Sequence, residues 1–307
     1  MKFSNRIQQV NPSMTLAIDA KAKEMKAKGE DVIGFGAGEP DFDTPDRIKQ
    51  AGIHAIETND THYTPVGGSN DLKDAIITKL KRDNGLDYER NQILASCGAK
   101  HSFYNLAQVL WEAGDEVIIP APYWVSFPEM VVLAGAKPVI IETNAASEFK
   151  VTVEQIKKVL TPNSRAIVIN TPSNPTGSAY EKSELESIAE FALENNLLVI
   201  SDEIYEWIVF DGFKHTSLAS LSKLAQKNCI VINGVSKSYA MTGWRIGYIA
   251  ADAEIVKQVT KLQGQSTSNP CSISQAASIE ALTGSHDDVL EMVREFEKRR
   301  DIMVSLL

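Results

Sequence analysis

Short apolar runs alternate along this chain with segments of helical periodicity. The helical pattern is clearest in Glu184–Asn196, where apolar residues return at helical spacing and form one stripe. Ser102–Leu110 and Asp71–Asn84 show the same pattern, and Gly85 closes the second of these helices. Between the predicted helices lie runs that are mostly apolar at consecutive positions, as in strands covered on both faces. The predicted strands are Ile93–Ser96, Glu116–Pro120, Pro138–Glu142, Ala166–Asn170, Leu197–Ser201, Ile230–Asn233 and Ile246–Ala250.

The alternation of strands with helices predicts the fold class. Such a pattern is typical of an α/β layered domain with a mainly parallel sheet. In these sheets ligands bind beyond the carboxyl ends of the strands. Polar residues that directly follow a predicted strand are therefore the first candidates for a functional site.

The two ends of the chain differ from its middle. Ser13–Lys28 is predicted to be a helix that Gly29 ends, and a glycine-rich turn follows at Gly36–Phe42. Asp287–Leu307 is predicted to be one long amphipathic helix. Its apolar stripe needs a packing partner, and we expect the exposed part of that stripe to lower solubility.

Composition narrows the possible classes of function. The 307 residues carry a formal net charge of −9, which argues against nucleic acid or a membrane surface as partner, since both require a basic face. No apolar run approaches the about twenty residues of a membrane span. Met1–Arg6 lacks the apolar core of a secretory signal, so we expect a cytoplasmic protein. Cys97, Cys229 and Cys271 are far apart and form no CxxC pair, which predicts free thiols and no metal site.

Polar clusters follow four of the predicted strands. They are Cys97–Lys100, Thr171–Gly177, Asp202–Tyr205 and the segment around Lys237. Taken singly, each has an ordinary structural interpretation as a turn or a helix cap. Because the carboxyl ends of parallel strands meet at one edge of a sheet, the four clusters together indicate a ligand site.

Lys237 indicates the chemistry of this site. A lysine at a strand end is usually solvated, but a partly desolvated lysine loses its charge more readily and can form a Schiff base with a carbonyl. Arg245, eight residues later, can hold an anion through two parallel hydrogen bonds. An amine nucleophile beside an anion clamp is what a pyridoxal phosphate site requires.

These clusters resemble the class I and II aminotransferases, which are pyridoxal-phosphate enzymes of fold type I. The resemblance covers essentially the whole chain. Within the family, the chain looks most like bacterial aspartate aminotransferases of the subgroup that also handles aromatic or prephenate-type substrates. It implies a three-layer αβα large domain with a mainly parallel seven-stranded sheet, plus an incomplete small α/β domain. The matching stretches are Gly36–Pro45, Tyr63–Gly68, Pro122–Met130, Asn170–Gly177, Ser201–Tyr205 and Asn233–Tyr248.

The resemblance implies a role for each residue around the cofactor ring. Lys237 would hold pyridoxal 5'-phosphate covalently and then shuttle a proton as the catalytic residue. Asp202 would pair with the pyridine nitrogen and keep the ring protonated. Tyr205 and Asn174 would hydrogen-bond the phenolic oxygen, and Asn174 would also face the substrate. Trp124 would stack on the ring and border the substrate.

The resemblance likewise assigns the phosphate and the assembly. Gly98, Ala99 and Lys100 would offer backbone N–H groups to the phosphate at a helix start. Arg245 and Ser236 would complete the phosphate site. Tyr63 matches a position that reaches across a dimer interface to the phosphate, which implies a homodimer with a shared active site.

For the substrate, the resemblance implies an L-amino acid donor, aspartate or an aromatic amino acid, and a 2-oxo acid acceptor such as 2-oxoglutarate. Gly38 would allow a close approach to the substrate α-carboxylate. Thr15 and Lys100 match positions that contact a distal carboxylate. An alternative interpretation makes Lys100 only a surface lysine on the phosphate side.

The resemblance also implies a domain organisation. Residues 1–45 would form an N-terminal arm with part of the small domain, residues 46–285 the large cofactor-binding domain, and residues 286–307 the start of the C-terminal small domain. The family continues past the position of Leu307, and the arginine that clamps the substrate α-carboxylate lies in that further part. Arg294, Arg299 and Arg300 are at the wrong place in the pattern to replace it. We therefore expect a C-terminally truncated chain with weakened substrate binding.

Two alternatives to an aminotransferase stay open on the sequence. One keeps the fold and cofactor but performs a lyase or synthase reaction, such as carbon–sulfur cleavage. The other is a truncated protein that binds the cofactor, or only dimerises, without turnover.

Overall fold

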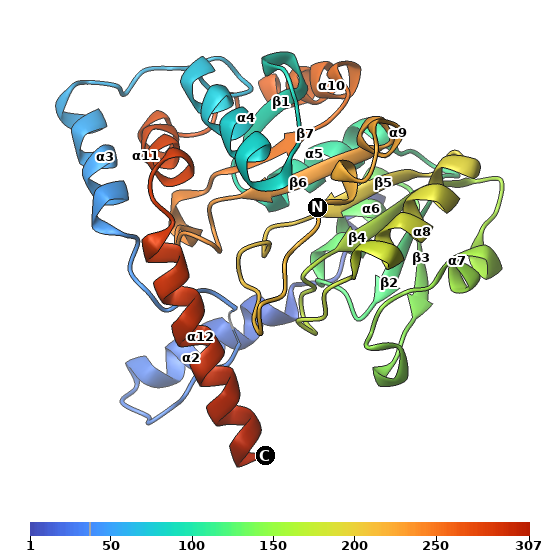
Figure 1. The fold of residues 1–307 in the computed structure, drawn as a ribbon, viewed down its shortest axis with the longest axis horizontal. Helices are drawn as coiled ribbons and strands as arrows, with labels where there is room; N and C mark the ends of the chain where they lie inside the picture. Colours follow the sequence, from blue (N-terminus) through green and yellow to red (C-terminus); the bar gives the residue numbers. More distant parts are fainter. Residues whose placement is uncertain (37) are drawn as a thin grey trace.

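A seven-stranded sheet runs through the middle of the molecule and carries helices on both faces (Figure 1). The structure is a computed structural model that describes residues 1–36 and 38–307; Ala37, in the glycine-rich turn, lies outside the described residues. All seven predicted strands are confirmed. They are β1 Ile93–Ser96, β2 Glu116–Ala121, β3 Lys137–Glu142, β4 Ser164–Asn170, β5 Leu198–Asp202, β6 Cys229–Gly234 and β7 Gly247–Ala250.

The strand order brings several chain turns to one edge of the sheet. The order is β1-β7-β6-β5-β4-β2-β3, and all pairs are parallel except the two that involve β7. Gly247, the first residue of β7, lies opposite Ser96 at the end of β1 and Gly234 at the end of β6. The amino end of β7 therefore shares an edge with the carboxyl ends of the other six strands.

Both faces of the sheet are buried, as the consecutive apolar positions predict. In β4, Ala166 and Val168 belong to one core cluster, which includes side chains of α5, α6 and α10. Ile167 and Ile169 alternate with them and pack into a second cluster with side chains of α4, α8 and α11. The predicted three-layer αβα arrangement is therefore confirmed.

The helices begin and end at recognisable signals. Ser69 caps α4 by accepting a hydrogen bond from the Leu72 amide at 3.1 Å, and Gly85 ends it at φ +67°. The helices are α1 Asn5–Gln8, α2 Met14–Ala27, α3 Asp46–Glu57, α4 Asn70–Asn84, α5 Ala99–Leu110, α6 Ser126–Ala134, α7 Val153–Val159, α8 Lys182–Glu194, α9 Lys223–Lys227, α10 Ala253–Gly264, α11 Ser272–Thr283 and α12 Asp287–Leu306, with 3-10 turns at Arg90–Gln92, Ala145–Ser147, Leu218–Ser220 and Thr242–Trp244.

Two predicted helix boundaries differ from the structure. Helix α8 begins at Lys182 because Glu181 and Glu184 form a reciprocal cap, and it ends before Asn195. Helix α5 begins at Ala99 rather than Ser102, directly after Gly98 at φ +91°. This earlier start matters for function, because it places the first amides of α5 at the edge of the sheet.

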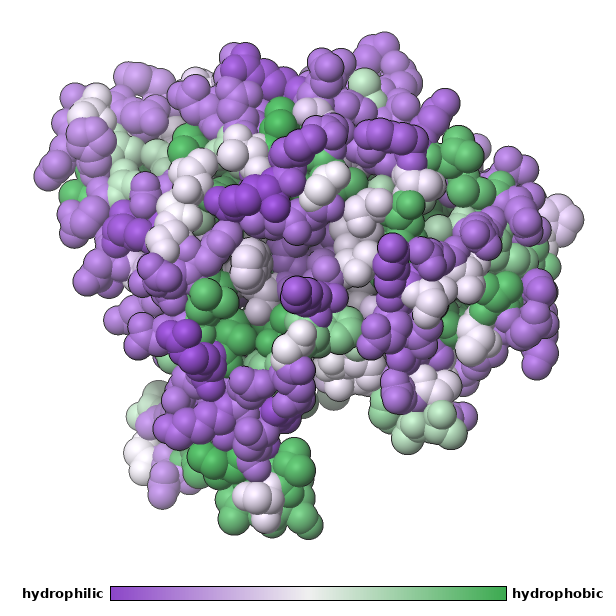
Figure 2. Space-filling model, viewed as in Figure 1, coloured by the Kyte–Doolittle hydropathy of each residue, from purple (hydrophilic) through white to green (hydrophobic). Residues whose placement is uncertain are grey.

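Helix α12 leaves the sheet-bearing part of the molecule and runs toward α2 in the view of Figure 1. Its middle is held by the segment before α3, since Phe296 meets the Phe42 ring edge-on at 5.2 Å and Arg299 pairs with Asp41. Its last turns are exposed and apolar, as the green surface at the lower tip of Figure 2 shows. Across the part of the chain that the structure describes, no helix has the length and apolar character to cross a membrane.

The contact between β7 and α5 leads to a test of the fold. A Cβ at Gly247 would collide with the Ala99 amide and Gly98, both backbone atoms that cannot move aside. We expect Gly247→Ala to lower the free energy of unfolding by about 1–3 kcal/mol or more, measured by urea unfolding. The control is Gly264→Ala at the end of α10, where the nearest atom to the new Cβ would be 3.7 Å away. Equal stability of the two variants would contradict the prediction.

Candidate active site

The edge shared by the strand ends holds most of the predicted site residues. Asn170, the last residue of β4, joins two of the polar clusters there. Its Nδ2 donates to the Asp202 carbonyl at 3.1 Å, and its Oδ1 accepts from the Asn174 amide at 2.7 Å. The turn after β4 is thereby fixed to the end of β5. Sequence analysis gave Asn170 no role of its own, although its position at a strand end before Thr171 was the available signal.

Lys237 lies in the turn after β6, three residues beyond Gly234. Its Nζ donates to the Gly38 carbonyl and lies 5.6 Å from the centre of the Tyr205 ring. Burial lowers the pKa of this amine, and Arg245 adds to the effect, while Glu39 and Asp202 oppose it. The amine therefore becomes neutral, and hence nucleophilic, more readily than an ordinary lysine.

Asp202 ends β5 and is buried. Burial raises the pKa of its carboxyl group to about 7, and the neighbouring Glu203 contributes. Its Oδ1 accepts a hydrogen bond from the Ile204 amide at 3.2 Å, and among the described residues it makes no ion pair. A buried carboxylate without a close counterion is stabilised by any cation that binds next to it.

Tyr205 follows in the same turn. Burial, together with the charge of Asp202, raises the pKa of its hydroxyl to about 12, while a hydrogen bond with the Asn174 side chain acts in the opposite direction. Tyr205 therefore stays a neutral hydrogen-bond donor at physiological pH. Its hydroxyl and the Asn174 amide lie together, as predicted from the two separate motifs.

Gly98, Arg245 and the start of α5 form the cationic part of the site. Arg245 donates to the Thr242 carbonyl at 2.8 Å and to the Cys97 carbonyl at 3.2 Å, so its guanidinium is held over Gly98. A Cβ at Gly98 would collide with that guanidinium. The first amides of α5 have no acceptor within the helix. A guanidinium and a helix N-terminus side by side form a binding site for an anion.

Trp124 and Lys100 border the same edge. The Lys100 Nζ lies 4.9 Å from the centre of the Trp124 ring, and Trp124 meets Phe127 edge-on at 5.2 Å. Partial burial lowers the pKa of Lys100, and Arg245 adds to this effect. Ser236, the remaining residue predicted to face the phosphate, is buried in the turn before Lys237.

Three further predicted residues come from outside the strand-end clusters. Tyr63 is 91% exposed, and Thr15 lies on α2. Within the described residues neither side chain makes a hydrogen bond or ion pair to the Lys237 turn. Gly38 does reach Lys237 through its carbonyl, but a Cβ at Gly38 would meet no atom within 4 Å, so lack of space does not by itself require glycine there.

A cleft of about 490 Å³ opens next to these groups. It is lined by Gly38, Asn174, Tyr205 and also by Arg300 from α12. Arg300 is engaged by Asp211, which accepts from both of its terminal nitrogens, one of them at 2.9 Å. Sequence analysis gave Arg300 no place in the site. No local motif marks the residue, because its position depends on where α12 leaves the large domain.

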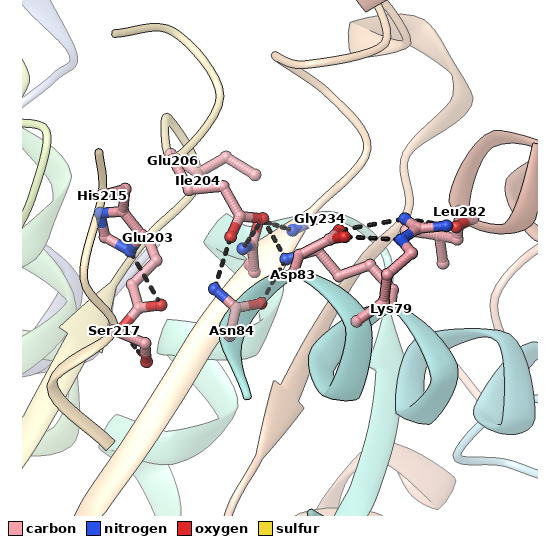
Figure 3. Close-up of polar contacts among 12 residues, drawn as sticks. Lys79, Asp83, Asn84, Glu203, Ile204, Glu206, His215, Ser217, Gly234 and Leu282 are labelled. Carbon is pink, nitrogen blue, oxygen red and sulfur yellow. Dashed lines mark hydrogen bonds and ion pairs between the residues drawn. The ribbon is translucent and has the colours of Figure 1, made fainter. Parts of the chain in front are cut away.

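A network of buried polar side chains surrounds Glu203 and Glu206, which directly follow Asp202 and Tyr205 in the chain (Figure 3). Glu203 accepts hydrogen bonds from Ser201 and Ser217, both at 2.8 Å, and contacts His215 Nε2 at 3.2 Å. Burial lowers the pKa of His215, but the charges of Glu203 and Glu206 outweigh it, so the pKa of the imidazole is raised overall. Sequence analysis missed this network, because Glu203 and Glu206 read as polar residues of a turn.

The residues present fit pyridoxal phosphate. The groups at this edge are an amine whose pKa is lowered by burial, a buried carboxyl group, a hydroxyl paired with an amide, and a glycine cradle under a guanidinium. They match, in the same order, the aldehyde, ring nitrogen, phenolic oxygen and phosphate of that cofactor. The fit rests on the types of group and their placement at one edge.

Comparison with known proteins identifies the family to which the chain belongs. Residues 30–307 match the family described as Aminotransferase class I and II. The chain is 55% identical to an aspartate aminotransferase of Bacillus sp. (strain YM-2) over 97% of its own length and 76% of the relative's, and 51% identical to one of Geobacillus stearothermophilus over 100% and 78%. The structure of an aspartate aminotransferase from Thermus thermophilus with maleate superimposes with a TM-score of 0.96 at 39% identity, over 99% of this chain and 80% of that one.

The raised pKa of Asp202 leads to a test by pH. Between the ordinary aspartate value of 3.8 and about 7, the folded chain keeps a proton that the unfolded chain loses, so stability falls as pH rises through this window. Asn cannot ionise. We therefore expect the stability of Asp202→Asn relative to the wild type to increase by about 2 kcal/mol or more as the pH rises from 4 to 7. Above pH 7 the difference between the two proteins should stay constant.

The measurement is urea unfolding of the cofactor-free protein across this pH range. Asp43→Asn, at an exposed position, is the control and should follow the wild type. A difference between Asp202→Asn and the wild type that stays flat or shrinks as pH rises would show that Asp202 is not held in its protonated form.

Proposed function

The chain belongs to the class I and II aminotransferase family, and from this premise we propose that it transfers an amino group from an L-amino acid to a 2-oxo acid with the help of pyridoxal 5'-phosphate. The observation that carries the proposal is the placement of Lys237, Asp202 and Arg245 at one edge of the sheet. Members of this family generally depend on that cofactor.

We assign the cofactor to the groups that meet at this edge. Lys237 binds it covalently, and Arg245, Ser236 and the first amides of α5, at Ala99 and Lys100, hold its phosphate. Gly98 leaves room beside them for the phosphate, but its own amide donates to the Ser96 carbonyl at 2.7 Å. Asp202 faces the ring nitrogen, Tyr205 and Asn174 bind the phenolic oxygen, and Trp124 covers the ring. When bound, the cofactor supplies an electron sink for the charge that forms at the substrate Cα.

The residues of the chain perform the proton chemistry. Lys237 Nζ takes a proton from the substrate Cα and returns one, a task that requires an amine whose pKa is lowered toward neutrality. Burial of Lys237 supports this role. Asp202 would stabilise a cationic ring nitrogen, since its buried carboxyl group makes no ion pair among the described residues. Asn174 and Tyr205 orient the reacting groups.

We propose L-aspartate as donor and 2-oxoglutarate as acceptor. Lys100, beside Trp124, supplies a cation for the distal carboxylate, and Thr15 and Gly38 contribute from the N-terminal segment. Asn174 and Trp124 border the substrate. Support comes from the aspartate aminotransferases among the relatives and from the Thermus relative solved with maleate, a dicarboxylate. Aromatic donors belong to the same proposal.

We also propose a homodimer with a shared active site. The support is Tyr63, which is exposed and makes no contact with the Lys237 turn of its own chain. In a two-fold dimer, a residue of this kind can complete the site of the other subunit. In this assignment residues 46–285 form the large cofactor-binding domain, and residues 1–45 and 286–307 contribute to a small domain.

Cofactor binding is the first test of the proposal. Purified protein mixed with pyridoxal phosphate should develop the visible absorption band of lysine-bound cofactor, and Lys237→Ala should abolish it because no amine is left at that position. Lys261→Ala, an exposed lysine on α10, is the matched control and should keep the band. A wild-type protein without the band would sink the cofactor assignment.

Turnover is the second test. With L-aspartate and 2-oxoglutarate, the wild-type chain should form oxaloacetate and glutamate, and Lys237→Ala should be slower by about a hundredfold or more. Omitting the 2-oxo acid separates this reaction from a lyase, which needs no acceptor. Formation of product without the 2-oxo acid would contradict amino transfer. The absorption band of lysine-bound cofactor without any turnover would indicate a protein that binds the cofactor but does not catalyse the reaction.

A further inference from the structure

We propose that Glu206 is a positioning residue, whose buried carboxylate holds the turn that carries Tyr205 and the turn that carries Lys237 at a fixed separation. The inference rests on the proposed function, because it gives that site a second layer of support. Glu206 touches none of the groups assigned to the cofactor, so its effect on the site passes through other residues.

The contacts of Glu206 come from two other elements (Figure 3). Lys79 and Asn84, both on α4, donate to it, the Asn84 Nδ2 at 2.8 Å. Asn233, near the end of β6, donates through its Nδ2 at 2.7 Å. Glu206, Lys79 and Asn233 are all nearly inaccessible to solvent. One carboxylate therefore connects a helix, the turn after β5 and the end of β6.

Glu206 is held in its charged form. Burial raises the pKa of the carboxyl group, but Lys79 and His215 outweigh burial, so its pKa lies below the ordinary value. Glu203, Glu206 and His215 bring ligand atoms within 4.8 Å of one another, as metal ligands do. In this structure the Lys79 ammonium lies against Glu206 and supplies the positive charge that the site needs.

The first connection runs from Glu206 to Lys237. Glu206 orients the Asn233 side chain by accepting a hydrogen bond from its Nδ2. The Asn233 Oδ1 in turn accepts a hydrogen bond from the Gly234 amide at 2.7 Å. The backbone at Gly234 is closely packed against β7, since a Cβ there would lie 2.8 Å from the Ile246 carbonyl oxygen. Lys237 follows three residues later. The direction in which the chain leaves β6 is therefore set by Asn233.

The second connection runs from Glu206 to Tyr205, its neighbour in the chain. The Glu206 amide donates to the Glu203 carbonyl at 3.0 Å, and the Ile208 amide donates to the Tyr205 carbonyl at 2.8 Å, so the carboxylate sits inside a closed turn. The Tyr205 ring and Lys237 Nζ lie 5.6 Å apart. Displacement of either turn changes this separation, and catalytic groups tolerate little misplacement.

A role in positioning can be separated from a role in stability. Removing one partner of a buried ion pair leaves an uncompensated charge and destabilises any fold, whereas replacing both partners by apolar residues is commonly neutral for stability. Lys79→Met/Glu206→Leu in the full chain therefore removes both charges and deprives Asn84 and Asn233 of their acceptor, which lowers stability less than an unpaired buried charge does. Thermal unfolding should show a folded protein.

We expect two changes in this double variant. Backbone amides of residues 234–239 in the cofactor-free protein should exchange with deuterium about tenfold faster than in the wild type. The pH midpoint of the lysine-bound absorption band should shift by about one unit, because Lys237 loses its fixed position relative to Asp202, Glu39 and Arg245. A purely structural role would change neither in a folded variant.

The matched control lies at the opposite edge of the sheet. Glu116, at the start of β2, is 8% exposed like Glu206, and accepts from Lys137 at 2.8 Å and from Thr161 at 2.6 Å. Lys137→Met/Glu116→Leu should leave the exchange of residues 234–239 and the pH midpoint as in the wild type. Wild-type exchange and midpoint in a folded Lys79→Met/Glu206→Leu protein would overturn the proposal.

A milder variant decides the matter if the double variant does not fold. Glu206→Gln removes the charge and keeps one acceptor, so faster exchange confined to residues 234–239 supports positioning. Exchange that is unchanged, or faster throughout the chain, overturns it. Absence of the cofactor band in the wild type would count against the proposed function alone, since the exchange comparison still decides whether Glu206 holds the Lys237 turn.

Discussion

The insertion of β7 between β1 and β6, antiparallel to both, is the constraint on which the rest of the site depends. A strand that runs antiparallel to its neighbours begins where they end. Arg245, just before β7, therefore lies at the same edge as Gly98 and Lys237, which follow β1 and β6. The insertion requires a close backbone approach, because β7 packs against the first residue of α5 and leaves no space for a side chain at Gly247. The guanidinium and the N-terminus of α5 meet because of this approach. An all-parallel sheet with the same sequence runs would place Arg245 at the opposite edge.

Burial then acts in opposite directions on the two ionisable groups that carry the chemistry. Removal from water disfavours a charge of either sign, so the same environment lowers the pKa of Lys237 and raises that of Asp202. In the chain without a ligand, the charged form of each group is therefore unfavourable. A carbonyl compound that reacts with the amine and carries a basic ring nitrogen relieves both at once. In the proposed assignment, the two pKa shifts therefore favour a molecule that brings both features.

The sequence predicted the strands, the layers and the polar clusters that meet at the strand ends, because each depends on local pattern. Apolar runs mark buried strands, and glycine, proline and polar residues mark the turns after them. The position of β7 was beyond such reasoning, since Ile246–Ala250 has the same apolar pattern whether its neighbours run parallel or antiparallel. Glu206 and Arg300 were also missed. A charged residue in a turn or on a helix is ordinarily solvated, and only the packing of α4 and the course of α12 bring these two to buried or cleft-lining positions.

Buried charged side chains are distributed differently at the two edges of the sheet, the edge at the amino end of β2 and the edge at the carboxyl ends of the strands. At the amino end of β2, Glu116 pairs with Lys137, whose side chain is largely exposed, so water shares the solvation of that pair. At the carboxyl edge, Lys79 and Glu206 are both removed from water, as are Glu203 and His215. Buried ion pairs are weak contributors to stability compared with apolar packing of the same volume. Their concentration at Glu203 and Glu206, the residues that directly follow Asp202 and Tyr205, is therefore poorly explained by stability. It is better explained by geometry, because directional hydrogen bonds fix the relative orientation of two turns where non-directional apolar contacts would let them slide.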